Sequence, residues 1–322
     1  MKMAILGAGN IARKMANTIT QMEDIEAYAV ASRDLEKAQA FAKKWGISKA
    51  YGSYEEMLED EDVELVYVCT PHSFHYQHMM MCLEHRKHVL CEKPFTVNAD
   101  EARKVFAFAK EKNLLATEGL WTRYLPMRLV LDQILERRII GDPKSLTANL
   151  CYPIKGVPRM TDPALAGGAL LDVGVYPINF AMMVFGNKIE HISSTCTKTE
   201  TGVDAANSIT LTFKNGNMAI LHSSMLCNSD RRGMIFGTKG FIEFLNINNC
   251  EGINVYDLDY NLIENYKPFK FITGFEHEVE ASQKAIAEGK LECKQMPHSE
   301  TIQVMEIMDG LRKEWGITYP ME

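Results

Sequence analysis

The first candidate ligand-binding residues form the pattern G-x-G-x-x-A near the start of the 322-residue sequence: Gly7, Ala8, Gly9, Asn10, Ile11 and Ala12. In such a pattern the first glycine permits a tight turn between a strand and a helix, and the second lets the backbone approach a pyrophosphate. The following helix N-terminus offers amide donors to phosphates. A glycine-rich turn without a ligand is the alternative. The strand-like run before the pattern favours a dinucleotide-binding turn.

Ser32 and Arg33 follow the second strand-like run, at the place where an NAD-dependent enzyme usually has an acidic residue for the ribose hydroxyls. A hydroxyl and a guanidinium instead suit the 2′-phosphate of NADP, because arginine binds phosphate in a fork. The alternative is an ordinary helix start, with Ser32 as a cap and Arg33 in solvent. We therefore expect NADP as the cofactor, with NAD as the alternative.

Thr70, Pro71 and His75 follow the strand predicted over residues 63–69. In a doubly wound fold this is the edge of the sheet at which ligands bind. Two more histidines lie nearby, but no cysteine or acidic ligand accompanies them, and we expect no metal site. The stretch is better interpreted as contacting the cofactor ribose or capping the next helix.

Glu92 and Lys93 stand between another apolar strand and Pro94, again at the expected ligand-binding edge. A lysine beside a proline has a restricted backbone. Near a nicotinamide, its ammonium could bind a substrate oxygen and favour negative charge there. For an isolated Lys-Pro pair, a surface loop is the better explanation.

Asp172 and Tyr176 follow a double-glycine turn and are four residues apart, so on a helix they share one face. A tyrosine near a positive charge can exchange a proton, because the charge lowers the tyrosine pKa from about 10. A buried tyrosine with a bonded hydroxyl, beside a solvated aspartate, fits the same pattern.

The elements that position these residues differ between the two parts of the chain. Up to residue 119 strand-like runs alternate with amphipathic helices, which is typical of a doubly wound parallel sheet with helices on both faces. Helices are predicted over residues 11–22, 35–45, 54–59, 74–85 and 99–112, between strands at 3–6, 26–31, 50–51, 63–69, 88–91 and 115–117. We therefore predict a Rossmann dinucleotide-binding domain over residues 1–119.

After residue 120 strand candidates follow one another with few helices between them, and Lys214–Asn217 has the composition of a hairpin turn. The predicted strands cover residues 146–152, 189–197, 208–213, 218–224, 233–236, 241–244 and 253–257. This indicates an α+β domain over 120–322, an open-faced antiparallel sheet with helices on one side. A final helix near 299–315 is expected to pack toward the first domain. The open face is expected to meet a partner subunit, giving a homodimer.

Composition excludes several classes of protein. The net charge of −7 argues against nucleic-acid binding, which needs a basic face. No apolar run approaches the roughly 20 residues that span a membrane, and the N-terminal residues do not resemble a secretory signal. The eight cysteines include no C-x-x-C pair, which fits reduced thiols and a cytoplasmic location.

These motifs, in this order along nearly the whole chain, resemble the Gfo/Idh/MocA family of oxidoreductases. The family usually has histidine four residues after the aspartate, where this sequence has Tyr176. That departure is similar to the branch of dimeric dihydrodiol dehydrogenases and NADP-dependent D-xylose dehydrogenases. Residues 118–126 and 167–172 also resemble that branch.

The resemblance implies site residues as well as a fold. Tyr176 would be the general acid/base, Lys93 its partner on the substrate oxygen, and Asp172 would orient the substrate or this pair. Trp121 and Arg123 would lie near the nicotinamide, and the substrate would meet Trp121, Arg159 and Tyr176.

The implied activity is hydride transfer between a nicotinamide and a CH–OH or carbonyl carbon of a sugar, polyol or trans-dihydrodiol. Inositol, an anhydro-sugar or a sugar phosphate are alternative substrates within the family. The absence of the usual histidine counts against inositol. A non-catalytic NAD(P)-binding regulator is the alternative of another class, and the presence of Lys93, Asp172 and Tyr176 counts against it.

Overall fold

The computed structural model describes residues 1–322 and contains two compact units. The first comprises Met1–Tyr124 and Phe271–Met305, and the second comprises Leu125–Lys270 and Glu306–Glu322. The first unit thus ends slightly beyond the predicted boundary at residue 119. It also contains residues 271–305, for which the sequence pattern indicated the second domain.

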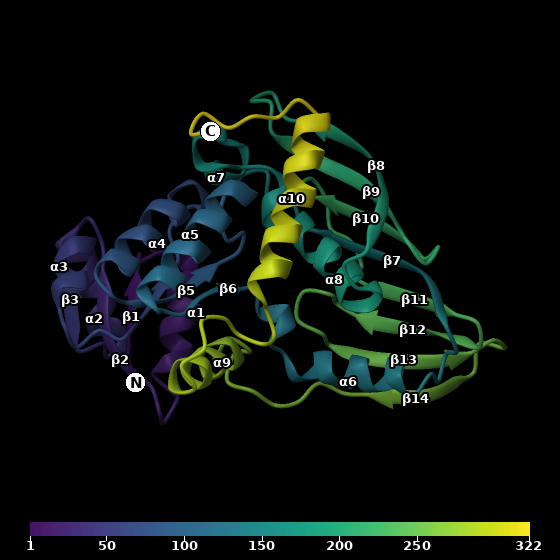
Figure 1. Ribbon diagram of the computed structural model, residues 1–322, viewed down its shortest axis with the longest axis horizontal. Helices are drawn as coiled ribbons and strands as arrows, with labels where there is room; N and C mark the ends of the chain where they lie inside the picture. Colours follow the sequence, from purple (N-terminus) through teal and green to yellow (C-terminus); the bar gives the residue numbers. More distant parts are fainter. The chain divides into compact units, whose positions relative to one another are not determined.

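The first unit is built on a six-stranded parallel sheet with the order β3-β2-β1-β4-β5-β6 (Figure 1). Its strands are β1 (Lys2–Leu6), β2 (Glu26–Ala31), β3 (Lys49–Tyr51), β4 (Leu65–Val68), β5 (His88–Glu92) and β6 (Ala116–Gly119). Its helices are α1 (Asn10–Ile19), α2 (Leu35–Trp45), α3 (Tyr54–Glu59), α4 (His75–Glu84), α5 (Ala99–Lys112) and α9 (Glu276–Ala287), with short 3-10 turns η1 (His72–Phe74) and η2 (Trp121–Arg123). The predicted doubly wound architecture is confirmed. The strand order reverses at β1, which is where such folds bind ligands.

The core of this unit lies between the sheet and the helices α1, α2 and α9. Met3, Ile5 and Tyr67 of the strands pack there with Met15 of α1 and Val279 of α9. Apolar residues alternate with this spacing because successive side chains of a strand point to opposite faces. The buried contacts hold the carboxyl ends of β1, β4 and β5 in fixed register.

The second unit is built on an eight-stranded sheet with the order β14-β13-β12-β11-β7-β10-β9-β8. The strands are β7 (Pro143–Cys151), β8 (Ile189–Lys198), β9 (Asp204–Phe213), β10 (Met218–Ser224), β11 (Gly233–Gly237), β12 (Gly240–Leu245), β13 (Gly252–Asp257) and β14 (Leu262–Tyr266). The predicted hairpin at Lys214–Asn217 joins β9 to β10. The prediction of a purely antiparallel sheet needs one correction, because β7 and β10 pair in parallel at its centre.

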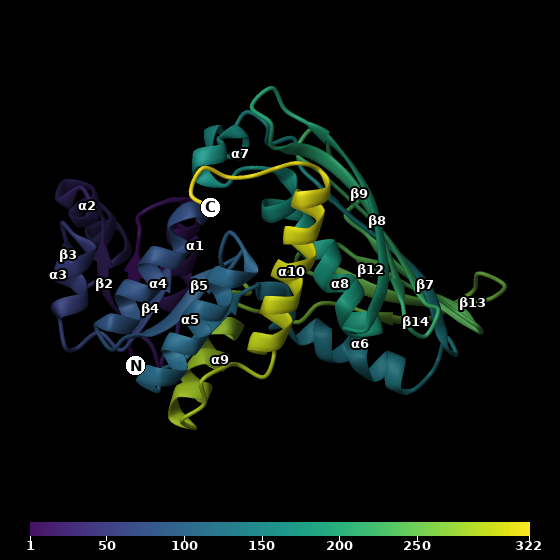
Figure 2. The same cartoon turned by 45° about the horizontal axis from the view of Figure 1, so that its top comes forward.

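Helices cover one face of this second sheet. The helical segments of this unit are α6 (Pro126–Glu136), α7 (Pro158–Thr161), η3 (Pro163–Leu165), the π-helix η4 (Leu170–Gly174), α8 (Val175–Phe185) and the later part of α10 (His298–Glu314). Helix α8 packs on β7 and β10. Figure 2 shows α6 and α8 on the same side of the sheet. One helical stretch, Pro163–Phe185, is long and apolar enough to cross a membrane, but 83% of its most apolar window is buried, as expected of a core helix.

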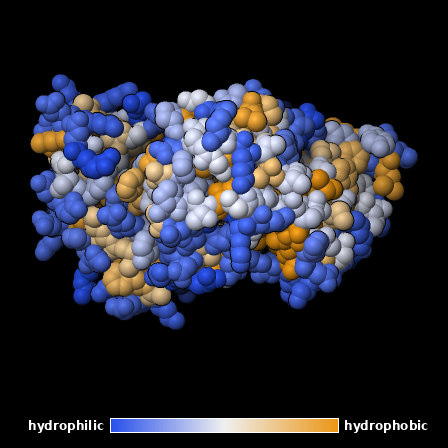
Figure 3. Space-filling view, turned by 90° about the horizontal axis from the view of Figure 1, so that it is seen from above, coloured by the Kyte–Doolittle hydropathy of each residue, from blue (hydrophilic) through white to orange (hydrophobic).

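The other face of the sheet is exposed and partly apolar. Along β10 the buried Ala219 and Leu221 alternate with the outward Met218 and Ile220, which are 41% and 43% exposed. Phe236 on β11 is also exposed. Over the part of the surface that this unit forms in Figure 3, apolar side chains are mixed with polar ones.

Candidate active site

The glycine-rich turn joins β1 to α1, as predicted. Gly7 has a φ of +114°, and a Cβ there would lie 3.3 Å from the Cys69 carbonyl oxygen, so only glycine fits this turn. Beyond Gly9, a Cβ would meet nothing within 4 Å. Helix α1 has no side-chain cap and no acidic residue in its first turn. Open space and uncapped amides are what a bound pyrophosphate requires, so these residues fit a dinucleotide.

A cavity of about 380 Å³ lies beside the ends of β2 and β4, with Arg33, Thr70, Pro71 and His78 in its walls. Arg33 is exposed there. Burial lowers the pKa of His78 to about 4, and its Nδ1 lies 2.9 Å from the Thr70 hydroxyl. The cavity therefore offers a guanidinium and a neutral imidazole to a ligand.

Ser32 has a more local role than its position suggested. Its side chain is mostly buried, and its hydroxyl accepts a hydrogen bond from the Asp34 backbone at 3.4 Å. Asp34 in turn caps α2 by accepting a hydrogen bond from the Lys37 backbone. The predicted binding of a 2′-phosphate therefore depends on Arg33.

His75 is fully buried and joins the loops that follow β4 and β5. Its Nδ1 lies 2.8 Å from the Pro94 carbonyl oxygen, and its Nε2 lies 2.9 Å from the Thr70 carbonyl oxygen. Burial lowers its pKa, so the ring is neutral and donates to one of these oxygens. Neither ring nitrogen is left for a ligand. In this structure His75 holds the loops together and does not present a nitrogen to a cofactor ribose.

Lys93 lies directly after β5 at the carboxyl edge of the sheet, where ligands bind. The preceding Glu92 is buried, bonds to the Tyr67 hydroxyl, and accepts a hydrogen bond from the Lys93 backbone at 3.3 Å. The Lys93–Pro94 peptide is cis. These contacts fix the backbone from which the half-buried Lys93 side chain extends.

Trp121 and Arg123 follow β6 in the turn η2, but their environments differ. The Trp121 ring packs on Phe275, with ring centroids 4.9 Å apart, and remains partly exposed. Arg123 is buried in an ion pair with Glu300 at the start of α10. Trp121 thus stays a candidate for contact with the nicotinamide. Arg123 instead forms an ion pair with the start of α10, within the first unit.

A buried carboxylate that the sequence did not reveal lies at this edge of the sheet. Glu278 on α9 is fully buried, and neither carboxylate oxygen has a hydrogen-bond partner in the protein. A Cβ on Gly119 would lie 3.3 Å from both oxygens. Burial, and the nearby Glu92 carboxylate, raise the pKa of Glu278 well above its usual value.

The raised pKa predicts how a Glu278→Gln variant responds to pH. A carboxyl whose pKa is higher in the folded state contributes stability below its unfolded pKa, and this stability is lost as pH rises toward the folded pKa. For one such group the loss is about 1.4 kcal/mol per pH unit. We expect Glu278→Gln to melt higher than the parent protein at pH 8, with the difference shrinking toward pH 4. Glu280→Gln, exposed on the same helix, is the control, and parallel curves for Glu278→Gln and the parent would contradict the assignment.

The second unit carries Asp172, Tyr176 and Arg159. Arg159 on α7 reaches Asp172 with both terminal nitrogens, at 3.1 and 3.4 Å, in a forked ion pair. Asp172 is 5% exposed and Tyr176 is 9% exposed. Arg159, which was predicted to contact the substrate, thus pairs with Asp172 within this unit, and its contact with a substrate stays a prediction.

The helix that carries these residues is not regular, contrary to the sequence prediction. Asp172 lies in the π-helix η4, and Tyr176 lies in the first turn of α8. Val175 donates to the Leu170 carbonyl five residues earlier. Pro177 explains the irregularity, because a proline inside a helix has no amide to donate and its ring crowds the carbonyl four residues before it. Such π segments are frequent at functional sites.

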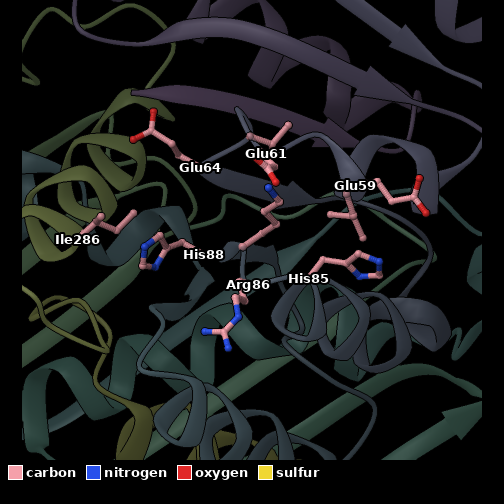
Figure 4. Close-up of a pocket in the computed structure, with 10 residues that line it drawn as sticks. Glu59, Glu61, Glu64, His85, Arg86, His88 and Ile286 are labelled. Carbon is pink, nitrogen blue, oxygen red and sulfur yellow. The ribbon is translucent and has the colours of Figure 1, made fainter.

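Another cavity, of about 530 Å³, lies at the opposite edge of the first sheet, near the starts of β4 and β5 (Figure 4). Glu59, Glu64 and Arg86 line it and point in different directions in Figure 4. The Lys87 ammonium donates to the Asp60 carbonyl at 2.7 Å. Ligands of doubly wound folds bind at the other edge, so this cavity is not the candidate cofactor site.

A parallel doubly wound sheet with an open glycine turn at its switch point defines a dinucleotide-binding protein, and the comparisons with known proteins identify its class. Residues 1–120 match the model of an oxidoreductase family with an NAD-binding Rossmann fold, and residues 129–243 match the C-terminal domain model of the same family. The chain belongs to the GFO/IDH/MocA family of NAD(P)-binding oxidoreductases.

Relatives match over essentially the whole chain. Trans-1,2-dihydrobenzene-1,2-diol dehydrogenase of Danio rerio is 32% identical over 330 residues, covering 100% of this chain and 99% of the relative. The Homo sapiens enzyme of the same name is 36% identical over 300 residues, covering 91% and 90% of the two chains.

Two solved structures share the fold at lower identity. A 3-ketoreductase from Actinomadura kijaniata, in complex with NADP and TDP-benzene, superimposes with a TM-score of 0.89 at 24% identity and 97% coverage of both chains. An aldose-aldose oxidoreductase from Caulobacter crescentus, complexed with glycerol, gives 0.88 at 20% identity, covering 98% of this chain and 97% of the other.

Proposed function

We propose that the chain is an NADP-dependent dehydrogenase or reductase of CH–OH groups that acts on a trans-dihydrodiol or a related sugar or polyol. The observation that carries the proposal is full-length similarity to trans-dihydrodiol dehydrogenases at 32–36% identity. Two local features support it. The open glycine turn fits a dinucleotide, and Tyr176 stands where the family usually has histidine.

The proposed chemistry assigns a separate role to the cofactor and to each candidate residue. When bound, the nicotinamide gives or takes the hydride. Tyr176 gives its phenolic proton to the developing alkoxide during reduction and takes the hydroxyl proton during oxidation. The Lys93 ammonium stabilises the negative charge on that oxygen. The forked pair with Arg159 fixes the Asp172 carboxylate on the helical segment that precedes Tyr176, and we assign to Asp172 the orientation of the substrate or of the catalytic pair.

A substrate panel tests the proposal. Purified protein is mixed with trans-dihydrodiols, aldoses and polyols, each with NADP and with NAD, and absorbance is followed at the reduced-nicotinamide band. Turnover of a dihydrodiol or pentose with NADP is expected. Tight NADP binding without turnover of any panel member would favour a non-catalytic regulator, and turnover of inositol alone would overturn the substrate class.

The choice of NADP over NAD is attributed to Arg33. Hydrogen bonds to charged groups contribute about 1.5–3 kcal/mol, so Arg33→Ala is expected to raise the KM for NADP about 10- to 100-fold. The KM for NAD should change little, because NAD has no 2′-phosphate. Lys37→Ala, exposed on the neighbouring helix α2, is the control. Equal changes in the KM for NADP and the KM for NAD would show that Arg33 does not bind the 2′-phosphate.

The exposed face of the second sheet is proposed to pair with a second copy of the chain. Outward Met218, Ile220 and Phe236 form its apolar part, and an apolar sheet face left by a monomer is a common dimer interface. Light scattering should give twice the chain mass of 36.4 kDa. Ile220→Asp should lower the mass to that of one chain, whereas Leu129→Asp, exposed on α6, should not. A parent protein of single-chain mass at all concentrations would contradict the dimer.

A cytoplasmic location is proposed from the thiols. All eight cysteines are free, and most are buried. Buried free thiols persist most readily in a reducing compartment.

A further inference from the structure

Asp204, which the proposed mechanism does not use, contacts the π-helix that carries Asp172. It opens β9 and is fully buried. Its Oδ2 accepts hydrogen bonds from the Leu170 backbone at 2.7 Å and from the Asn207 side chain at 2.9 Å. Leu170 is the first residue of the π-helix, which has no cap from its own segment. A carboxylate from a distant strand therefore caps this helix.

Both ends of the π-helix rest on the same polar cluster. At its start, a Cβ on Gly168 would lie 2.4 Å from Asp204 Oδ1, and Gly168 has a φ of +121°. At its end, a Cβ on Gly174 would lie 3.0 Å from the Ser223 hydroxyl. Ser223 donates to Asn207 Oδ1 at 2.8 Å, and Asn207 donates to Asp204. The cluster of Asp204, Asn207 and Ser223 thus contacts the helical segment at both ends, from Gly168 to Gly174.

The hydrogen bonds from this cluster compensate for the irregular backbone of the π-helix. Pro177, just after Tyr176, has no backbone amide and so removes one hydrogen bond from the helix. The backbone hydrogen bonds of this segment are therefore too irregular to fix its orientation alone. An unpaired buried carboxylate is costly, and Asp204 offsets part of that cost through charge-assisted bonds to two donors. Burial raises the pKa of Asp204 to about 6, and Arg312 opposes this rise.

We propose that Asp204 is a positioning residue that sets the orientation of Tyr176 through the π-helix. The inference rests on the proposed role of Tyr176 as the proton donor. A misplacement of about 1 Å at a reacting group can cost about 100-fold in rate. Loss of the cap should therefore lower kcat more than substrate affinity, and it should leave NADP binding to the first unit unchanged.

Three variants at these positions test the proposal. Asp204→Ala should lower kcat about 10- to 100-fold with less than about a 3-fold change in the Kd for NADP. Asp204→Asn keeps an oxygen for the Leu170 and Asn207 donors and should restore most of kcat. Ser223→Ala, which removes only the support near Gly174, should lower kcat a few-fold. Val255→Ala, buried on β13 outside the cluster, is the control for general destabilisation.

The pH profile of kcat separates positioning from simple loss of stability. In Asp204→Ala the apparent pKa assigned to Tyr176 should shift, while Val255→Ala should keep the parent profile even at an equal loss in melting temperature. Unchanged kcat and pH profile in Asp204→Ala would overturn the proposal. If Asp204→Ala does not fold, a Ser223→Ala enzyme with parent kcat and pH profile would overturn it instead. A fully active Tyr176→Phe enzyme would contradict the proposed function, which distinguishes the two failures.

Discussion

A Tyr176→Phe enzyme is expected to lose about 10²–10⁴-fold in kcat while binding NADP as tightly as the parent protein, because one positioned acid/base contributes about that much rate. Phenylalanine keeps the ring that fills this mostly buried position and removes only the hydroxyl that moves the proton. Single-turnover measurements with saturating NADPH would isolate the chemical step.

The matched control is Tyr152→Phe in the same unit. The Tyr152 hydroxyl accepts a hydrogen bond from Asn248 at 3.0 Å, so its removal also deletes a tyrosine hydroxyl from the second unit. We expect Tyr152→Phe to keep the parent kcat. Full turnover by Tyr176→Phe would show that the proton comes from another group.

Replacing Lys93 by methionine has the second large expected effect. Methionine keeps an unbranched apolar side chain but has no ammonium, so charge on the substrate oxygen is no longer stabilised. Removing one donor of this kind typically costs about 10²–10³-fold in kcat. The double variant with Tyr176→Phe should cost little more than the worse single variant, because residues that act as a unit are not additive.

Lys104→Met is the control for the loss of a lysine charge, since Lys104 is exposed on α5 and pairs only with the nearby Asp100. Its kcat/KM should equal that of the parent. If the effects of Lys93→Met and Tyr176→Phe multiplied fully in the double variant, the two groups would act on separate steps.

Much of the fold could be predicted because its signals are local. Alternation of strands and helices predicts the parallel sheet, and Lys214–Asn217 predicts the hairpin between β9 and β10. The parallel pairing of β7 with β10 could not be predicted, since a strand has the same alternation whichever direction its neighbour runs. Tertiary packing also decides that residues 271–305 belong to the first unit, and no local sequence pattern predicts it.

The sequence indicates some parts of the candidate site but gives no signal for others. Gly7, Lys93 and Asp172 are candidates from the sequence because each lies in or close to a short motif of recognisable composition, and their roles stay predictions. His75 was placed at the correct edge, but no spacing shows that both its ring nitrogens face backbone carbonyls. The burial of Asp204 and Glu278 could not be predicted, because acidic residues are rarely buried and their residue types indicate surface positions.

A deuterium-transfer experiment would show whether the enzyme moves a hydride between substrate and cofactor. The parent enzyme would be incubated with NADP and a trans-dihydrodiol, or the panel member that turns over, carrying deuterium on the carbinol carbon. The reduced cofactor would then be analysed by mass spectrometry. Direct transfer between the two carbons predicts one deuterium in each NADPH formed. NADPH without deuterium, or deuterium released to water, would contradict the proposed function.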